Sequence, residues 1–488
     1  MSDESSGASQ TGSSQDESRW WDATTVAEKV AAGEVSAAEM TEAAIARIES
    51  GDAELNAVVI RWFDHAREVA ASDLPDGPFR GVPFLLKDLW IQYAGQGRTD
   101  GNVAMAANPP ISSVDSVLVG RFKRAGLVTL GRSASPEMGT LPVTETVAHG
   151  ATRNPWNTDY VPGGSSGGAA AAVAAGFVPI AHASDGGGSI RIPASCCGLV
   201  GLKTSQGRIS MQGHGIETGL GVDFCVSRSV RDSARLLDAV QGPGVGDSII
   251  APPPHGSYVD EVGRDPGSLR IGLLDYHPQG GGLHDDCIAA VRGAAATLER
   301  LGHHVADSHP ATLDDASFTS RFMAMWAAGR RVGLTSFEKA LGRALTEEEV
   351  EPQNWAQAQF ADQMTASQYA DALSAVAEYR RATQQWWADG WDLLLTPTLA
   401  EPPPRIGEML ARPDDPMAGM ARAGEVVPFT PPFNTSGQPA ISLPLYWADS
   451  GLPIGVQLVA GYGREDVLFA VAAQLEEAMP WADRHPPL

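Results

Sequence analysis

The sequence predicts an α/β fold, a single large domain built on a mixed, twisted β-sheet with helices on both faces. Short apolar runs typical of strands alternate along the chain with helical patterns, and this alternation places helices on both sides of a sheet. Length and a hydrophobic content of 43% over 488 residues would allow two or three domains. The motifs described below instead favour one.

Residues 1–18 contain acidic but no basic residues and no apolar run, so we interpret them as a disordered acidic tail. The main domain is therefore expected over residues 19–488. A secretion signal needs a basic start and an apolar run, and the tail has neither. Because no stretch approaches the roughly 20 apolar residues of a membrane span, we expect a soluble protein of the cytoplasm without a membrane partner.

Helices and strands alternate in the first third of the chain. Residues 24–50 predict two helices, the second opened by a capping box of Ser36 and Glu39. Further strands are expected at 56–60, 81–86 and 127–130, and further helices at 62–71 and 114–124.

Two glycine-serine clusters occupy the middle of the chain. The first, GGSSGG, lies at 163–168 and is followed by an alanine-rich stretch at 169–176. Because alanine is the best helix former, we predict that this stretch is a helix. The apolar run at 177–183 predicts a buried strand, and the second cluster, DGGGS, follows it. Ser189 should therefore lie just past a strand end, where open α/β sheets place their chemistry.

The second half of the chain continues the alternation around a helical insertion at about 316–389. Residues 241–268 and 397–432 are rich in proline or glycine and are predicted to be irregular, the latter as a mobile rim over a pocket. Strands are expected at 199–203, 270–274, 392–395 and 454–460, and helices at 230–240, 285–301 and 464–477.

A serine hydroxyl is a weak nucleophile until a base takes its proton. None of the eleven histidines lies in a recognisable base or metal motif. Among the lysines we expect only Lys87 to follow a strand-like run, GVPFLL at 81–86, on entry to the core. Burial there would lower the lysine pKa and leave a neutral amine able to accept a proton.

Three motifs together carry a resemblance to a known family. GVPFLLKDL, GGSSGG and DGGGSIRIPAS resemble the amidase signature family of serine amidohydrolases. The interval from Ser165 to Ser189 matches that between the two serines of the family. FNTSGQPAISLP and LPIGVQLVAGYGRED are similar to its 6-aminohexanoate-cyclic-dimer hydrolase branch, and the resemblance extends over residues 19–485.

The resemblance implies a serine amidase, a hydrolase that cleaves a carboxylic amide through an acyl-enzyme on Ser189. It implies Ser165, on a cis peptide bond, and Lys87 as the proton relay to that nucleophile. It requires no cofactor and no metal. The substrate stays open and includes linear or cyclic amides such as aminohexanoate oligomers.

The resemblance also implies an oxyanion hole formed by the backbone N–H groups of Gly186, Gly187 and Gly188 together with that of the nucleophile. Asp185 and Arg191 flank this turn and are expected to form a supporting ion pair. In the family, the loop-rich segment at 131–157 lines one wall of the site.

Three alternatives remain at this point. Ser166 fits G-x-S-x-G, the nucleophile elbow of α/β hydrolases, although the segment before it makes a poor strand. The amidase-like subunit of a tRNA-dependent amidotransferase, which works only within a complex, carries a similar motif set. The tryptophans of the helical insertion could either pack or contact substrate; they are Trp326, Trp355, Trp386 and Trp387.

The chain has 35 basic and 59 acidic residues, a net charge of −24, which argues against nucleic acid as a partner. We expect a small-molecule amide as the partner, with a homodimer as one alternative for the assembly. The acidity favours solubility, and a high-salt environment stays open. Four cysteines, including the adjacent pair Cys196 and Cys197, suggest neither a disulfide framework nor a zinc site.

Overall fold

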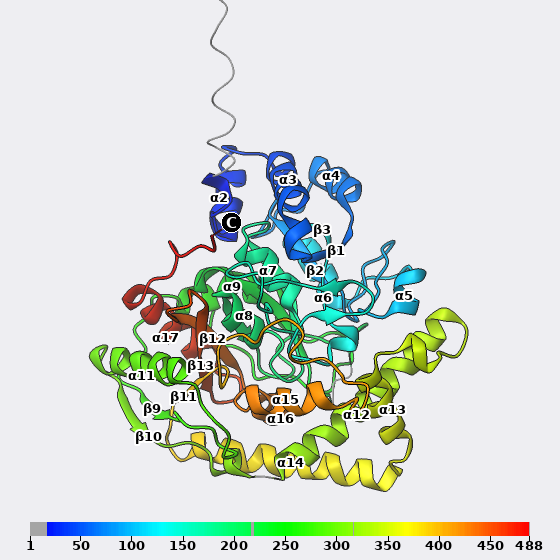
Figure 1. Ribbon diagram of the computed structural model, residues 1–488. Helices are drawn as coiled ribbons and strands as arrows, with labels where there is room; N and C mark the ends of the chain where they lie inside the picture. The colour runs from blue at the N-terminus through cyan, green and yellow to red at the C-terminus, as the bar shows by residue number, and fades with distance from the viewer. Residues whose placement is uncertain (1–16, 216–218, 316, 488) are drawn as a thin grey trace, which may run out of the picture.

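The computed structural model describes residues 17–215, 219–315 and 317–487, and confirms the α/β fold (Figure 1). One mixed sheet of eleven strands runs through these residues in the order β1-β3-β2-β6-β8-β7-β12-β13-β11-β9-β10, and β4 and β5 form a separate hairpin. The strands are β1 (Val58–Arg61), β2 (Pro83–Lys87), β3 (Val128–Ser133), β4 (Glu145–Thr146), β5 (Gly150–Ala151), β6 (Ile180–Asp185), β7 (Val200–Lys203), β8 (Val222–Ser227), β9 (Arg270–Leu273), β10 (His304–Asp307), β11 (Leu393–Pro397), β12 (Ala440–Trp447) and β13 (Pro453–Ala460).

Parallel and antiparallel pairs both occur in the large sheet. Strand β2 pairs in parallel with β3 and β6, and β9 pairs in parallel with β10 and β11. The strands from β6 through β8, β7, β12 and β13 to β11 pair antiparallel. Strands β2, β3, β8 and β13 are buried at every position, which requires cover on both faces of the sheet.

Helices form the cover. Helices α7 and α8 contact each other and the central strands, whereas α9 and α11 pack with α17 in another layer. At one end of the molecule α12, α13 and α14 lie together, and α15 and α16 lie between them and the sheet (Figure 1). The helices are α2 (Ala23–Ala31), α3 (Ala37–Leu55), α4 (Phe63–Ala71), α5 (Val103–Ala107), α6 (Val117–Arg124), α7 (Gly167–Ala174), α8 (Arg191–Cys197), α9 (Val230–Val240), α10 (Tyr258–Glu261), α11 (Asp285–Arg300), α12 (Phe318–Leu341), α13 (Pro352–Asp362), α14 (Ala366–Ala388), α15 (Ala418–Val426), α16 (Pro431–Ser436) and α17 (Glu465–Ala478).

Several elements differ from the sequence prediction. Strand β8 was not expected, yet it lies at the centre of the sheet between β6 and β7. Helix α8 also escaped prediction, because seven residues with a proline inside are too short to display a helical period. Helix α15 interrupts the segment 397–432, which was predicted to be irregular. The capping box of Ser36 and Glu39 is present as predicted.

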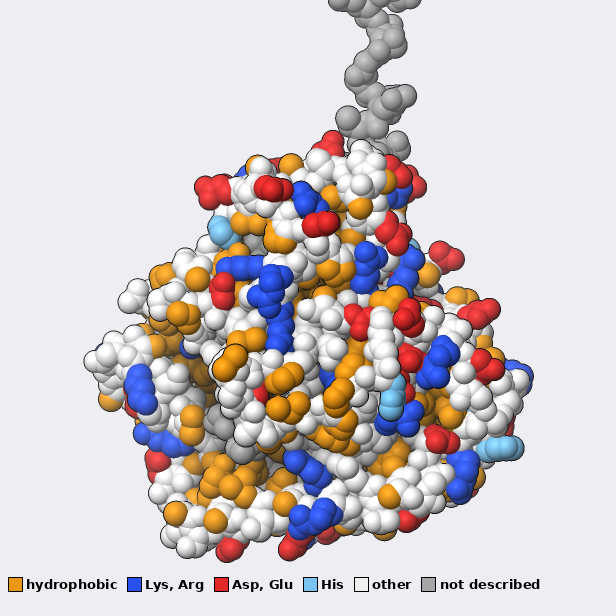
Figure 2. Space-filling model, turned by 180° about the vertical axis from the view of Figure 1, so that it is seen from behind, with side chains coloured by type: hydrophobic (Ala, Val, Ile, Leu, Met, Phe, Trp, Pro, Cys, Tyr) orange, Lys and Arg blue, Asp and Glu red, His pale blue; other side chains and the backbone are white. Residues whose placement is uncertain are grey.

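The two ends of the described chain meet beside α2, where Trp20 stacks on His485 with ring centroids 3.8 Å apart (Figure 1). Residues 1–16 of the predicted tail lie outside the described residues, and Ser18 is buried. Acidic, basic and hydrophobic side chains are interspersed on the face drawn in Figure 2. Of the helices in the described ranges, none has both the length and the apolar character that a membrane span requires.

Candidate active site

Lys87 ends strand β2 and is fully buried. Its amine lies 2.7 Å from Ser165 Oγ and 3.0 Å from Ser184 Oγ, to which it donates hydrogen bonds. Burial lowers the Lys87 pKa from its ordinary value to about 7, against the opposing charges of Asp223 and Asp185. Burial thus favours the uncharged amine over the ammonium at this position.

The pairing of β2 with β6 sets the position of the amine. The strands run parallel, with Leu85 opposite Ala181, and the Lys87 backbone N–H donates to His182 Nδ1 at 3.2 Å. Side chains two residues apart on a strand point to the same face, so Ser184 lies on the same side as His182. Ser184 was missed from the sequence, although strand alternation beyond His182 would have indicated it.

Asp223, on β8, is one of the two buried carboxylates that act on this lysine. It contacts His182 Nε2 at 3.1 Å and His214 Nε2 at 3.0 Å. Burial alone would raise the Asp223 pKa, but the two histidines outweigh it and hold that pKa well below its usual range. Among the described residues, no group of three or more His, Cys, Asp or Glu side chains is arranged to hold a metal ion.

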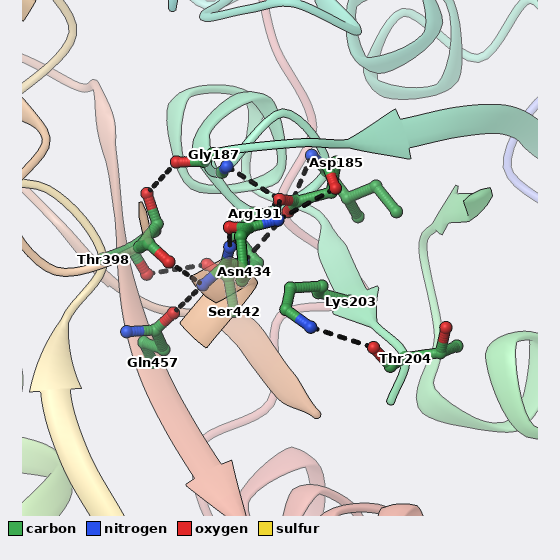
Figure 3. Close-up of polar contacts among 12 residues, drawn as sticks. Asp185, Gly187, Arg191, Lys203, Thr204, Thr398, Asn434, Ser442 and Gln457 are labelled. Carbon is green, nitrogen blue, oxygen red and sulfur yellow. Dashed lines mark hydrogen bonds and ion pairs between the residues drawn. The ribbon is translucent and has the colours of Figure 1, made fainter. Parts of the chain in front are cut away.

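Lys203 is a second buried lysine, so the expectation that Lys87 alone follows a strand is wrong. It ends β7, and burial lowers its pKa to about 7 as well. Its amine donates to the Thr204 carbonyl oxygen at 3.0 Å, and its side chain points toward Thr204 in Figure 3. Among the described residues, Lys87 forms a hydrogen bond with a serine of the GGSSGG cluster, whereas Lys203 does not.

Ser165 follows a cis peptide bond from Gly164 and is buried. A Cβ placed on Gly139 would lie 3.0 Å from Ser165 Oγ, so Gly139 packs directly against this hydroxyl. Gly139 and Ser189 line the same pocket. Across the residues described, the structure joins Lys87 to Ser165 but contains no direct hydrogen bond between Ser165 and Ser189.

Ser189 lies four residues beyond the end of β6, past a strand end as predicted. It opens into a cavity of about 130 Å³ between α12 and the segment that holds α15. Ser166, the nucleophile of the elbow alternative, is fully buried and donates to the Ser184 carbonyl oxygen at 3.2 Å. It does not line the cavity, which contradicts that alternative.

One of the donors predicted in the glycine turn before Ser189 is engaged within the protein. The Gly188 N–H, which we expected in the oxyanion hole, donates to Asp185 Oδ1 at 2.7 Å. The buried carboxylate takes this donor because it needs hydrogen bonds once removed from water. The N–H groups of Gly186, Gly187 and Ser189 donate to no other described residue, and Gly187 and Ser189 line the cavity.

Asp185 and Arg191 form the ion pair that the sequence predicted. Arg191 Nε and Nη2 each lie 3.0 Å from one carboxylate oxygen (Figure 3). Burial alone would raise the Asp185 pKa, but the Arg191 charge and hydrogen bonds outweigh it and lower that pKa to about 2. Both side chains are fully buried, so the hydrogen bonds between them take the place of contact with water.

Later elements complete the surroundings of Arg191. The guanidinium donates to Thr430 O at 3.0 Å, Gln457 Oε1 at 2.7 Å and Asn434 Oδ1 at 2.6 Å. The Thr430 hydroxyl in turn donates to the Gly187 carbonyl oxygen at 2.7 Å. None of these three partners was predicted, because nothing in the local pattern of a distant segment indicates an arginine partner.

The four tryptophans of the helical insertion were predicted either to pack or to contact substrate, and the structure places them differently. Trp326 lines the cavity beside Ser189. Trp386 and Trp387 pack on each other with ring centroids 4.8 Å apart, and Trp355 packs beside a buried cluster that includes Phe337. The predicted wall from 131–157 is also found, since residues 139–142 line the cavity.

Comparisons with known proteins agree with this arrangement. A family model described as Amidase matches residues 39–469. The chain is 44% identical over 479 residues to 6-aminohexanoate-cyclic-dimer hydrolase of Pseudomonas sp. (strain NK87), with 96% of this chain and 97% of the relative covered. The solved structure of a 6-aminohexanoate cyclic dimer hydrolase complexed with substrate is similar at a TM-score of 0.92 and 43% identity, over 96% of this chain and 99% of that one.

The amidotransferase alternative receives less support. The solved structure of a glutamyl-tRNA(Gln) amidotransferase chain of Thermotoga maritima gives a TM-score of 0.76 at 24% identity, with 95% of this chain and 96% of that chain covered. This likeness shows a common fold only. The comparisons therefore favour an amide-cleaving hydrolase over a component of a transferase complex.

Proposed function

This chain belongs to the amidase family, and from that premise we propose that it hydrolyses a carboxylic amide through an acyl-enzyme on Ser189, with Ser165 and Lys87 as its proton relay. The observation that carries the proposal is the 2.7 Å contact between the buried Lys87 amine and Ser165 Oγ. A fully buried lysine with a pKa of about 7 is matched to proton transfer at neutral pH.

In the first step, neutral Lys87 accepts the Ser165 proton while Ser165 accepts that of Ser189. Ser189 Oγ then bonds to the amide carbon. Because the described residues include no hydrogen bond between Ser165 and Ser189, the Ser189 hydroxyl has to turn toward Ser165 when substrate binds. Hydrogen bonds at catalytic sites often tighten only in the substrate complex. The N–H groups of Gly186, Gly187 and Ser189 would stabilise the oxyanion, each contributing about 3 kcal/mol.

The carbon–nitrogen bond breaks in the second step. The proton held by Lys87 returns through Ser165 to the leaving nitrogen, and the released amine departs while Ser189 keeps the acyl group as an ester. Water then attacks this ester and passes a proton into the same relay. The bond between the acyl carbon and Ser189 Oγ breaks, the acyl group leaves as a carboxylic acid, and the relay returns the proton to Ser189 Oγ. Every proton is conserved within the three side chains, the amine and the water.

The relatives suggest where to begin with substrates. Because the 44%-identical relative is a 6-aminohexanoate-cyclic-dimer hydrolase, we propose an aminohexanoate oligomer as the first amide to test. We further propose that the enzyme acts in the cytoplasm on small molecules, without nucleic acid or membrane partners, and that a homodimer is the assembly to test first.

Substitution of the two serines tests the assignment. Ser189→Ala should abolish amide hydrolysis and covalent labelling by a fluorophosphonate, because the acylated oxygen is gone. Ser166→Ala is the matched control, since it removes a neighbouring buried hydroxyl outside the cavity and should retain labelling. Labelling that persists in Ser189→Ala and disappears in Ser166→Ala would reject the proposal.

A further inference from the structure

The cavity beside Ser189 is walled by large apolar side chains. Helix α12 supplies one wall and the segment around α15 and α16 supplies the other. The main contributors are Phe318, Phe322, Met323, Trp326, Met420 and Pro431. The cavity thus offers a substrate apolar surface next to the acylated oxygen.

Among the described residues, no charged side chain joins this wall. Of the residues that the structure describes, no Asp, Glu, Lys, Arg or His lines the cavity, although the chain as a whole carries a net charge of −24. Its polar side chains are neutral and include Thr140, Gln279 and Thr319. A charged group in such a cavity would lose its hydration without gaining an ionic partner, which is strongly unfavourable.

The aromatic side chains follow one stripe of α12. Phe318, Phe322 and Trp326 are spaced four residues apart, which places them on one face of a helix. The rings of Phe322 and Trp326 are stacked, with centroids 5.2 Å apart and an interplanar angle of 23°. Together they present flat apolar surface to the cavity.

This stripe lies against the glycine turn. A Cβ on Gly186 would lie 3.2 Å from Trp326 Cζ3, and one on Gly187 would lie 3.3 Å from Phe322 Cζ. A substrate carbonyl bound to the free N–H groups of this turn would therefore lie close to these two rings.

Arg330 holds Trp326 in place from outside the cavity. Its guanidinium carbon lies 4.6 Å from the centre of the Trp326 ring, within the range of a cation–π contact. The same guanidinium donates to Met138 O and, at 2.8 Å, to Thr140 Oγ1. The aromatic wall is thereby tied to residues 138–140, of which Gly139 and Thr140 also line the cavity, and is formed before substrate binds.

We propose that this cavity selects amides whose adjoining substituent is uncharged and apolar, held against the faces of Phe322 and Trp326, and that it excludes substituents carrying a carboxylate or an ammonium. The inference rests on the proposed function and specifies its substrate class. A cyclic or aryl amide without ionised groups meets the requirement, whereas the ionised ends of a linear amino-acid oligomer do not.

Matched anilides provide the test on the full-length enzyme. Hexananilide is compared with adipic acid monoanilide, which adds a carboxylate on the acyl side, and with 4-hexanamidobenzoate, which adds one on the amine side. We expect kcat/KM to fall at least about a hundredfold for the analogue whose carboxylate enters the cavity. Hydrolysis of both charged analogues within threefold of hexananilide would overturn the inference.

A lysine placed in the wall should reverse the selection. Met323→Lys is expected to raise the kcat/KM ratio of the disfavoured carboxylate to hexananilide by about tenfold or more. Val332→Lys is the matched control, because Val332 lies on the same helix and is 54% exposed, and it should leave the ratio unchanged. An unchanged ratio in a folded Met323→Lys enzyme contradicts the inference.

The outcomes separate the two proposals. Absence of hydrolysis of all three anilides and of the aminohexanoate cyclic dimer, with no fluorophosphonate label on Ser189, would reject the proposed function and this inference together. Hydrolysis with labelling of Ser189 but without discrimination by charge would reject only the inference.

Discussion

The Thr430 hydroxyl donates a 2.7 Å hydrogen bond to the Gly187 carbonyl oxygen. Asp185 holds the same turn from the other side by accepting the Gly188 N–H at 2.7 Å. With its carbonyl and its N–H both engaged, the turn keeps the N–H groups of Gly186 and Gly187 in fixed positions. Donors fixed in this way stabilise a developing oxyanion without reorganisation.

Thr430→Val should therefore slow catalysis more than it weakens binding. The substitution keeps the side-chain shape but removes the hydrogen bond to the turn, so we expect kcat to fall roughly tenfold to a hundredfold with a smaller change in KM. Steady-state kinetics on hexananilide measures both. Thr430→Ser restores the hydroxyl and should recover most of the loss; failure of this rescue would contradict the positioning role.

Arg191→Lys should destabilise the protein in spite of the conserved charge. A lysine cannot reproduce the guanidinium bonds to Asp185, Gln457 and Asn434, and we expect the free energy of unfolding to decrease by about 3 kcal/mol in urea titrations. Arg231→Lys is the control, because its pair with Asp22 is partly exposed and should cost less than about 1 kcal/mol. Equal effects of the two changes would contradict this account.

Lys87→Met should stabilise the protein most at low pH. Burial lowers the Lys87 pKa from 10.5 to about 7, so between these pH values the unfolded chain binds more protons and stability rises with pH. Below a pH of about 7 the folded protein buries the Lys87 ammonium. Replacing it with methionine should therefore increase the free energy of unfolding by on the order of a few kcal/mol.

Thermal unfolding at pH 6 and at pH of about 10 measures this difference. The advantage of Lys87→Met should shrink as the pH rises toward 10.5, because the unfolded chain then also loses the lysine proton and burying a neutral amine costs progressively less. Lys339→Met removes an exposed lysine of α12 and should show no such dependence. An advantage that is independent of pH would argue against the lowered pKa.

Asp223→Asn should shift the pH dependence of activity. The Asp223 charge raises the Lys87 pKa against the effect of burial, so its removal should lower that pKa further. The relay needs the neutral amine, and the acidic limb of the kcat/KM profile should consequently move to lower pH. Asp371→Asn, at an exposed position of α14, should leave the limb in place; a shift of the Asp223 variant to higher pH would contradict the assignment.

The sequence by itself determined those features that are written in local patterns. Alternating apolar runs predicted the sheet and its helices, and a strand followed by glycines predicted Ser189 past the end of β6. An apolar run before Lys87 predicted its burial, and the close spacing of Asp185 and Arg191 predicted their ion pair. Each of these depends on residues only a few positions apart, whose geometry the chain fixes directly.

The tertiary structure alone decided which distant groups meet at the site. Thr430 reaches Gly187 across 243 positions of the chain, and in the structure Lys87 differs from the equally buried Lys203 by its contact with Ser165. The Gly188 N–H is not a free donor, because it donates to the buried carboxylate of Asp185. Hydrogen bonds between remote segments depend on how sheet and helices pack, and they leave no periodic trace in the sequence.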